Sequence, residues 1–116
     1  MKVIRIVANI ETEKIEAAKC FYQDVLGLEL LMDHGWIASY GSREEMCVQV
    51  SFASEGGAGT PVPDLSIEVD HVDTAFERMT AAGFPIEYGP VNESWGVRRF
   101  YARDPYGKLI NIVAYL

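Results

Sequence analysis

The chain has 116 residues, of which 49% are hydrophobic and 23% charged, the composition of an ordinary globular protein with one domain. Seventeen acidic against ten basic residues give a net charge of -7, which repels a phosphate backbone and excludes nucleic acid as an expected partner. The acidity either attracts a cationic ligand or only keeps the protein soluble. No apolar run has membrane-spanning length and no leader pattern opens the chain, so we expect a cytoplasmic protein with no membrane partner.

The first half of the chain predicts a strand, a helix and three further strands. Apolar residues take every second position over 3–10, which predicts a half-buried strand whose core face carries Ile4, Ile6, Ala8 and Ile10. Thr12 is a candidate helix N-cap, and Gly27 ends the helix because glycine takes the left-handed C′ conformation without strain. The helix is expected to pack through residues at helical spacing, namely Ile15, Ala18, Tyr22 and Val25. The three further strands are expected at 28–32, 36–40 and 46–52.

The two cysteines fall on these elements, Cys20 in the helix and Cys47 in the last strand. Two cysteines are too few for a disulfide framework, and neither has a partner at metal-site spacing. We therefore expect both to be reduced, packed thiols.

The second half repeats this order after a linker at 53–63, which is rich in glycine and proline. A strand is predicted over 65–69, and a helix begins near Asp70 and ends at Gly83. The helix carries Val72, Ala75, Phe76 and Met79 on one face. Strands are expected near 86–88, over 97–103 and at the C-terminus.

The last two strands form a β-hairpin around Asp104-Pro105-Tyr106-Gly107, where proline presets φ and glycine tolerates a positive φ. In the terminal strand Ile110 and Ile112 alternate with Asn111 and Val113. One face of this strand is therefore apolar, and Asn111 points away from the main core.

A nearly constant offset relates the two halves. It is 57 residues from Val7 to Asp64 and from Ala18 to Ala75, and 56 from Gly27 to Gly83. The fold is therefore predicted to be α+β, with a βαβββ unit at about 1–53 and another at about 64–116 within a single domain 1–116. Because each helix covers one face of its sheet, the other faces are expected to curve around a common cavity.

Several phrases resemble the vicinal oxygen chelate superfamily, which contains glyoxalase I, extradiol dioxygenases and bleomycin resistance proteins. They are Phe21-Tyr22 followed by Leu26-Gly27-Leu28, Ala81-Ala82-Gly83-Phe84, and Trp95-Gly96 leading to Phe100 and Asp104-Pro105-Tyr106-Gly107. The resemblance covers essentially the whole chain and is greatest to the bleomycin resistance branch. It implies the glyoxalase/bleomycin resistance fold and a homodimer with ligand clefts at the interface.

Metal-dependent members of that superfamily bind the metal through His, Glu or Gln at positions that the resemblance places on Val7, Gln49, Asp64 and Asn111. Valine cannot bind a metal, and amide oxygens are weak ligands for catalytic transition metals. His34 and His71 match none of these positions. We therefore expect no metal, no other cofactor and no catalytic residues.

The preferred hypothesis is a metal-independent protein that binds a small molecule, with sequestration of a cationic antibiotic of the bleomycin type as its activity. One alternative is a lyase, isomerase or dioxygenase of the same superfamily with an atypical metal site at Gln49, Asp64 and Asn111. Another is an accessory or regulatory domain that binds a metabolite or a protein.

The candidate ligand-binding residues are aromatic or polar side chains on the faces turned away from the core. Tryptophan binds cations best among the aromatic residues, although Trp36 and Trp95 also suit the core or a dimer contact. Arg99 is expected to meet a ligand carboxylate or an acidic neighbour, and Asp64 either a ligand cation or solvent. The candidates are Trp36, Tyr40, Gln49, Asp64, Trp95, Arg99, Tyr101 and Asn111.

Overall fold

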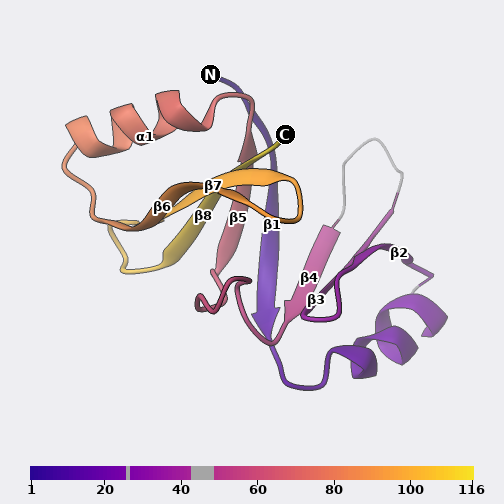
Figure 1. Ribbon diagram of the computed structural model, residues 1–116. Coiled ribbons are helices and arrows are strands. Elements are labelled where there is room, and N and C mark those ends of the chain that lie inside the picture. Colours follow the sequence, from indigo (N-terminus) through magenta and orange to yellow (C-terminus); the bar gives the residue numbers. More distant parts are fainter. Residues whose placement is uncertain (26, 43–48) are drawn as a thin grey trace. The chain divides into compact units, whose positions relative to one another are not determined.

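The computed structural model describes residues 1–25, 27–42 and 49–116 (Figure 1). Within them the chain divides into two compact units, an N-terminal unit of Val7–Val62 and a C-terminal unit of Met1–Ile6 with Pro63–Leu116. The elements are β1 (Val3–Glu11), η1 (Ile15–Ala17), η2 (Lys19–Val25), β2 (Glu29–Asp33), β3 (Ile37–Gly41), β4 (Gln49–Ala53), β5 (Leu65–Val69), α1 (Val72–Ala81), β6 (Ile86–Glu93), β7 (Val97–Arg103) and β8 (Leu109–Tyr115).

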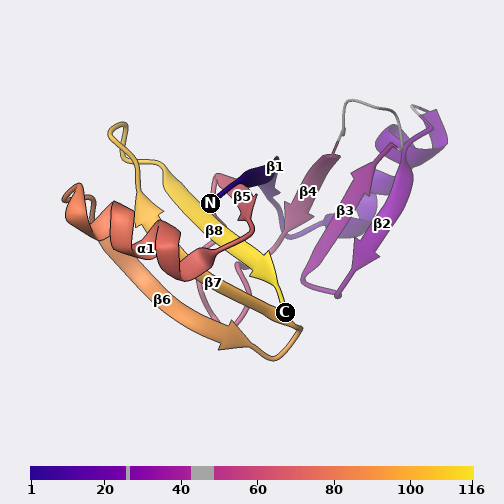
Figure 2. The same cartoon turned by 90° about the horizontal axis from the view of Figure 1, so that it is seen from above.

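In the C-terminal unit the strands follow the order β5-β8-β7-β6, with β5 and β8 parallel and the other pairs antiparallel. Helix α1 lies along one face of this sheet (Figures 1 and 2), and its Val72 and Ala75 are buried against Phe100 and Ile112. The start of β1 belongs to the same unit, where Arg5 forms an ion pair of 2.5 Å with Glu68 of β5.

In the N-terminal unit the order is β2-β3-β4-β1, with β1 and β4 parallel. The helical segment η1–η2 covers one face, since Ala18 packs with Tyr40 and Phe52. Each unit thus has the order strand, helix, three strands, and the predicted pair of βαβββ units is confirmed.

Glycine ends both helical segments as the sequence predicts, because Gly27 and Gly83 have φ values of 74° and 85°. After α1, the N–H of Gly83 donates to Thr80 O and the N–H of Phe84 donates to Met79 O. These two hydrogen bonds form a Schellman motif, which satisfies carbonyls that the helix leaves unpaired.

The first helical segment is not the expected α-helix but a 3₁₀ turn, η1, followed by a π-helix, η2. Thr12 lies three residues before the segment begins, and although it accepts a hydrogen bond from the Lys14 N–H, the N-cap residue is Lys14 and not the predicted Thr12. Because a π-turn contains more residues than an α-turn, the predicted apolar face rotates away after Tyr22, and Val25 is 71% exposed. Cys20 is likewise an exposed free thiol, so the prediction that it is packed was wrong. Cys47 lies outside the described residues.

The prediction for the faces of β1 was also wrong. Ile4 and Ile6 are each 57% exposed, Ile10 is 44% exposed, and Val7 on the opposite face is buried. Among the described residues, neither hydrophobic cluster under the helices includes a side chain from β1. Alternation therefore identified which residues of β1 form its apolar face. The error was to assume that this face is buried in the core, because neither helical segment covers it.

Strand β6 extends to Glu93, well beyond the predicted end near Tyr88, although Gly89 and Pro90 lie within it. Proline is tolerated there because β6 is an edge strand, the last in the sheet order. An edge strand has a neighbour on one side only, so the N–H that proline lacks need not donate to a second strand. Gly89 has a φ of 74°, and a Cβ at this position would lie 2.5 Å from the backbone oxygen of Arg99. The strand thus needs glycine where it approaches β7.

Candidate functional site

A row of side chains crosses all four strands of the C-terminal unit on the face opposite α1. Ser66 of β5 pairs in register with Asn111 of β8, Asn111 with Tyr101 of β7, and Tyr101 with Tyr88 of β6. Residues opposite one another in paired strands project from the same face. We call Ser66, Asn111, Tyr101 and Tyr88 the polar row.

Asn111 has a buried oxygen that finds no hydrogen-bond partner within the described part of the chain. The residue is 8% exposed, and its flanking residues Ile110 and Ile112 belong to the core on the other face. Its amide nitrogen donates to the Ser66 hydroxyl at 3.1 Å, whereas Oδ1 has no donor among the residues that the structure describes. A buried acceptor without a donor is energetically costly, so this oxygen is a candidate contact for a further hydrogen-bond donor.

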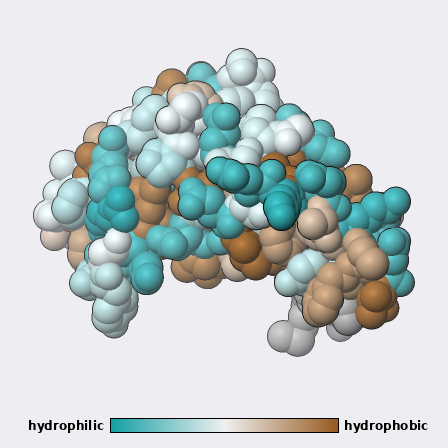
Figure 3. Space-filling model, turned by 90° about the horizontal axis from the view of Figure 1, so that it is seen from below, coloured by the Kyte–Doolittle hydropathy of each residue, from teal (hydrophilic) through white to brown (hydrophobic). Residues whose placement is uncertain are grey.

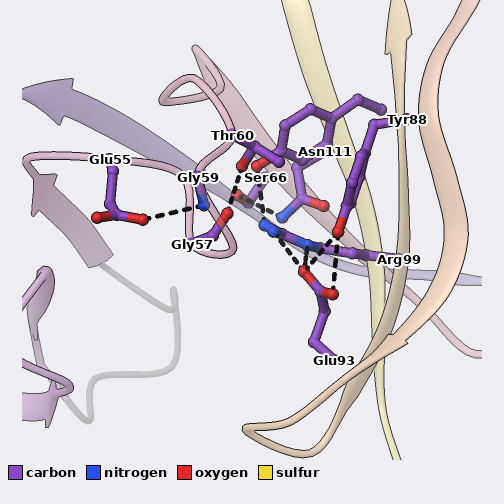
Figure 4. A network of polar contacts seen from close by, with 10 residues as sticks. Glu55, Gly57, Gly59, Thr60, Ser66, Tyr88, Glu93, Arg99 and Asn111 are labelled. Carbon is purple, nitrogen blue, oxygen red and sulfur yellow. Dashed lines mark hydrogen bonds and ion pairs between the residues drawn. The ribbon is translucent and has the colours of Figure 1, made fainter.

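Beside the polar row, Arg99 and Glu93 form a buried ion pair (Figure 4). Nη2 of Arg99 lies 2.6 Å from Oε2 of Glu93, and the two side chains are 4% and 6% exposed. A second donor of Arg99, Nη1, reaches the Tyr101 hydroxyl at 2.8 Å. The pair adds no net charge to the face, because each ion neutralises the other.

Three aromatic rings surround the Arg99 guanidinium. Its central carbon lies 4.9 Å from the ring centroids of Trp95 and Tyr101 and 5.4 Å from that of Tyr88. All are within the distance of a cation–π interaction. This aromatic cage, formed by Tyr88, Trp95 and Tyr101, is therefore already occupied by a cation of the protein itself.

Tyr88, on the edge strand β6, contacts the carboxylate of the ion pair. Its hydroxyl donates to both carboxylate oxygens of Glu93, at 3.0 and 3.2 Å. Burial raises the pKa of the Tyr88 hydroxyl, and the neighbouring Glu93 charge raises it further, because both disfavour a second anion. The Tyr88 proton is thus held on its oxygen.

The tight turn between β6 and β7 positions Trp95. The N–H of Gly96 donates to Glu93 O at 3.2 Å, and Gly96 has a φ of 91°. Trp95 is half-buried over Arg99. The local sequence Glu93-Ser-Trp-Gly96 thus sets the ion pair and the ring next to each other.

Four of the predicted site residues lie together in this group, namely Trp95, Arg99, Tyr101 and Asn111. Arg98 points to the opposite side of β7, where it pairs with Asp73 of α1 at 2.9 Å, because successive side chains of a strand point to opposite faces. Arg99 meets an acidic neighbour, Glu93, which was one of its two expected roles.

Asp64 has a structural function at the start of the β5–β8 pair. Its Oδ2 accepts a hydrogen bond from the Leu109 N–H at 2.9 Å, and its own N–H donates to Leu109 O. This carboxylate therefore helps to align the parallel strands.

The remaining three candidates belong to the N-terminal unit. Tyr40 is 4% exposed and packs with Phe52 in the core under the helical segment. Trp36 is half-buried and stacks on His34 with ring centroids 6.1 Å apart. Gln49 is half-buried at the start of β4.

Sequence reasoning missed Ser66, Tyr88 and Glu93. The 57-residue offset makes Ser66 the equivalent of Asn9 in the first half. Alternation along its strand also places Ser66 on the non-core face, as it does Asn111, so the sequence contained a signal for Ser66. Glu93 lies beyond the strand that was expected near 86–88, because β6 continues through Gly89 and Pro90 to Glu93.

Comparison with known proteins identifies the family. A sequence model described as Glyoxalase/Bleomycin resistance protein/Dioxygenase superfamily matches residues 6–112. The chain belongs to this superfamily. No curated protein matches the sequence of this superfamily member.

Solved structures share its fold at low identity. The NAD-dependent benzaldehyde dehydrogenase from Legionella pneumophila is 14% identical, with a TM-score of 0.75 over 97% of this chain and 100% of the other. A glyoxalase/bleomycin resistance protein/dioxygenase superfamily member from Vibrio splendidus 12B01 is 19% identical, with a TM-score of 0.65 over 97% and 99%. Methylmalonyl-CoA epimerase from Mycobacterium tuberculosis is 18% identical, with a TM-score of 0.67 over 95% and 86%.

The donor atoms at the positions where the resemblance implies a metal decide whether one fits. Of the four positions implied by the resemblance, Val7 has no donor, Gln49 and Asn111 offer amides, and Asp64 uses an oxygen for Leu109. In residues 1–25, 27–42 and 49–116, no three His, Cys, Asp or Glu side chains gather as a metal site would require. These residues do not fit a catalytic transition metal.

In the same ranges, no helix is long and apolar enough to span a membrane.

Proposed function

We propose that this superfamily member is a metal-independent small-molecule binding protein whose ligand contacts the polar row of the C-terminal unit. The observation that carries the proposal is Asn111 Oδ1, which is buried and has no donor in residues 1–25, 27–42 and 49–116. An unsatisfied buried polar atom costs about 1–3 kcal/mol. A ligand that donates a hydrogen bond to Oδ1 recovers this free energy.

The neighbours of Asn111 support a binding role. Tyr88 and Trp95 are half-buried aromatic side chains on the same face, held in place by Arg99 and Glu93. Ligand sites are typically apolar and aromatic surfaces with a few fixed polar groups. A rigid ion pair beneath two aromatic rings provides such a surface.

Metal independence is part of the proposal, and the chemistry of the donors supports it. The enzyme alternative needs a metal held by Gln49, Asp64 and Asn111, yet only one of these is a carboxylate, and it also accepts the Leu109 N–H. Neutral amides contribute little to the affinity of a transition-metal site. Metal analysis of protein purified without chelator tests this point, and one equivalent of a divalent transition metal per chain contradicts it.

The binding role is tested by screening small molecules in the presence of chelator, with tryptophan fluorescence and ligand-observed NMR as readouts. We expect saturable binding that Asn111→Ala weakens. Asn92→Ala is the matched control, because Asn92 is an exposed amide on β6. Equal weakening by both variants, or no binding by the wild type, contradicts the proposal.

Sequestration of a cationic antibiotic is the second candidate, favoured by the net charge of -7. It is tested by titrating the protein with metal-free bleomycin at low and raised salt. Saturable quenching that weakens with salt supports it. The aromatic cage opposes it, because Arg99 already occupies the rings that a drug cation would use.

We also propose a homodimer, supported by the exposed apolar face of β1. Ile4, Ile6 and Ile10 leave this face uncovered within the single chain, and exposed apolar patches often mark interfaces. Hydrophobic residues also reach the surface on the side shown in Figure 3. Sedimentation velocity should give a dimer that Ile4→Lys with Ile6→Lys converts to a monomer. A wild-type monomer at all concentrations contradicts the proposal.

A further inference from the structure

We propose that the outer side of the helical segment η1–η2 is a docking surface for a basic amphipathic helix of another protein. This function is separate from the small-molecule binding proposed for the C-terminal unit, and neither depends on the other. Three features of the N-terminal unit support it. They are a row of exposed apolar side chains, a row with carboxylates beside it, and the sign of the unit's charge.

The first feature is a row of exposed apolar side chains along η1–η2. Phe21 is 59% exposed and Val25 is 71% exposed, and Ala17 is exposed as well. They lie four positions apart, and a tight 3₁₀ turn followed by a wide π-helix averages close to the spacing that makes such residues neighbours. Ala18 and Tyr22, one position further on, pack in the core instead. We call Ala17, Phe21 and Val25 the apolar row, a kind of surface that protein partners cover.

The second feature is a row with carboxylates beside the apolar row. Glu16 and Asp24 are exposed, and each directly precedes a member of the apolar row. Cys20, which is also exposed, takes the position between them. Because 16, 20 and 24 keep the same spacing of four, the two rows run side by side along the segment. The two carboxylates suit lysine or arginine side chains that flank the apolar residues of a partner.

The third feature is the charge of the N-terminal unit. Residues 7–62 contain nine acidic and three basic side chains, whereas the remainder of the chain contains eight and seven. Almost all of the net charge of -7 therefore belongs to this unit. A field of one sign attracts a partner of the opposite sign and repels a second copy that presents the same carboxylates. The occupant is thus a different, basic protein.

The spacing of the rows favours a helical partner. Side chains spaced by four form ridges, and two helices pack when the ridges of one enter the grooves of the other. The segment from Ile15 to Val25 spans about three turns. A partner helix with apolar residues at i, i+4 and i+8, and with lysine or arginine beside them, matches both rows.

The experiment compares three labelled peptides of about 16 residues, long enough to form a helix on binding. The first has leucine at i, i+4 and i+8 and lysine beside each leucine. The second has glutamate in place of lysine, and the third has the composition of the first in an order that breaks the leucine row. Fluorescence anisotropy gives the dissociation constants. We expect the first peptide to bind at least about tenfold more tightly than either of the others, and its advantage over the glutamate peptide to shrink as salt is raised.

Variants of exposed residues locate the binding surface. Val25→Ser should weaken binding of the lysine peptide about fivefold or more, because it removes apolar area that the peptide covers. Leu31→Ser is the matched control, since Leu31 is 43% exposed but lies on β2. Asp24→Asn should weaken binding about twofold at low salt and have no effect at high salt. Glu11→Gln, at the exposed end of β1, removes the same charge elsewhere and should have no effect.

The exposed thiol of Cys20 gives a second readout that needs no substitution. It lies between Glu16 and Asp24 and next to Phe21, so a docked helix covers it. Saturating lysine peptide should slow its alkylation by iodoacetamide, as followed by mass spectrometry. Peptide mapping distinguishes Cys20 from Cys47.

Several outcomes would overturn the inference. Equal binding of the lysine peptide and its reordered form, or equal losses in Val25→Ser and Leu31→Ser, would show attraction by charge alone. Absence of binding by all three peptides, or unchanged alkylation of Cys20 at saturation, would remove the docking surface. Loss of self-association in Val25→Ser would identify a second copy as the occupant. None of these results bears on small-molecule binding at the polar row, which is measured separately with Asn111→Ala.

Discussion

The guanidinium of Arg99 and the carboxylate of Glu93 form a 2.6 Å ion pair from which solvent is almost completely excluded. Breaking a buried pair by removing one partner leaves an uncompensated charge, which typically costs about 3–5 kcal/mol. We therefore expect Glu93→Gln to lower the free energy of unfolding by about 3 kcal/mol or more. Urea denaturation followed by far-UV circular dichroism measures the change.

The pair between Arg103 and Glu87 provides the control for this prediction. Its N···O distance is 2.5 Å, but the two side chains are 38% and 39% exposed. Exposed ion pairs contribute little because water and salt screen them. Glu87→Gln should therefore leave stability almost unchanged, and equal losses for the two variants would contradict the importance of burial.

Gly89 is required by the close approach of β6 to β7. A Cβ there would lie 2.5 Å from Arg99 O, and the φ of 74° is strained for any L side chain. The strain in φ costs about 1–2 kcal/mol, and overpacking against the backbone adds about 1–3 kcal/mol. We expect Gly89→Ala to lower the denaturation midpoint and to reduce ligand binding, because it displaces the backbone of Arg99.

Gly107 separates the two contributions. It has a similar φ of 77°, but a Cβ there would have no atom within 4 Å. Gly107→Ala should show the cost of the φ value alone. A Gly89→Ala variant that loses no more stability than Gly107→Ala would disprove the steric contact.

Tyr88 makes stability sensitive to alkaline pH. Burial, followed by the hydrogen bond to Glu93 and its charge, raises the pKa of Tyr88 above the ordinary value of 10.0. Between the ordinary value and the folded value the unfolded chain loses the proton and the folded chain keeps it. This contribution to stability is therefore complete below pH 10 and declines as the pH rises through the folded pKa.

Absorbance at 295 nm and thermal unfolding between pH 8 and about pH 11.5 test this prediction within the range where tyrosine titrates. Tyr88→Phe should remove part of the alkaline loss of stability. Tyr106→Phe is the control, because Tyr106 is 86% exposed. An alkaline profile that Tyr88→Phe leaves unchanged would show that its hydroxyl is not held by Glu93.

Ser39 and Ser51 make a buried hydrogen bond in the N-terminal unit. Their hydroxyl oxygens are 2.6 Å apart, and the residues are 1% and 2% exposed. Either single substitution by alanine leaves one buried hydroxyl without this partner, so we expect each to cost about 1–3 kcal/mol. The double variant should cost less than the sum, and an additive double-mutant cycle would refute the coupling.

Much of the fold followed from patterns in the sequence. The 57-residue offset and the alternation in the strands predicted the two βαβββ units. The glycines at 27 and 83 ended the helical segments where expected, because only the backbone conformation of one residue was involved. The π-helical form of 19–25 was not predictable, since Ile15, Ala18, Tyr22 and Val25 follow the spacing of an ordinary α-helix.

In the candidate site, the sequence by itself determined which side chains share a face. Arg99 and Tyr101 alternate with Phe100, and Asn111 alternates with Ile110 and Ile112, because a strand has a period of two residues. Only the tertiary structure decided that Glu93 reaches Arg99, that Tyr88 contacts Glu93, and that Asn111 Oδ1 has no donor among the described residues. Alternation specifies direction within one strand, whereas these contacts depend on the register between strands and on what covers each face. For the same reason the apolar face of β1 was predictable, but its exposure was not.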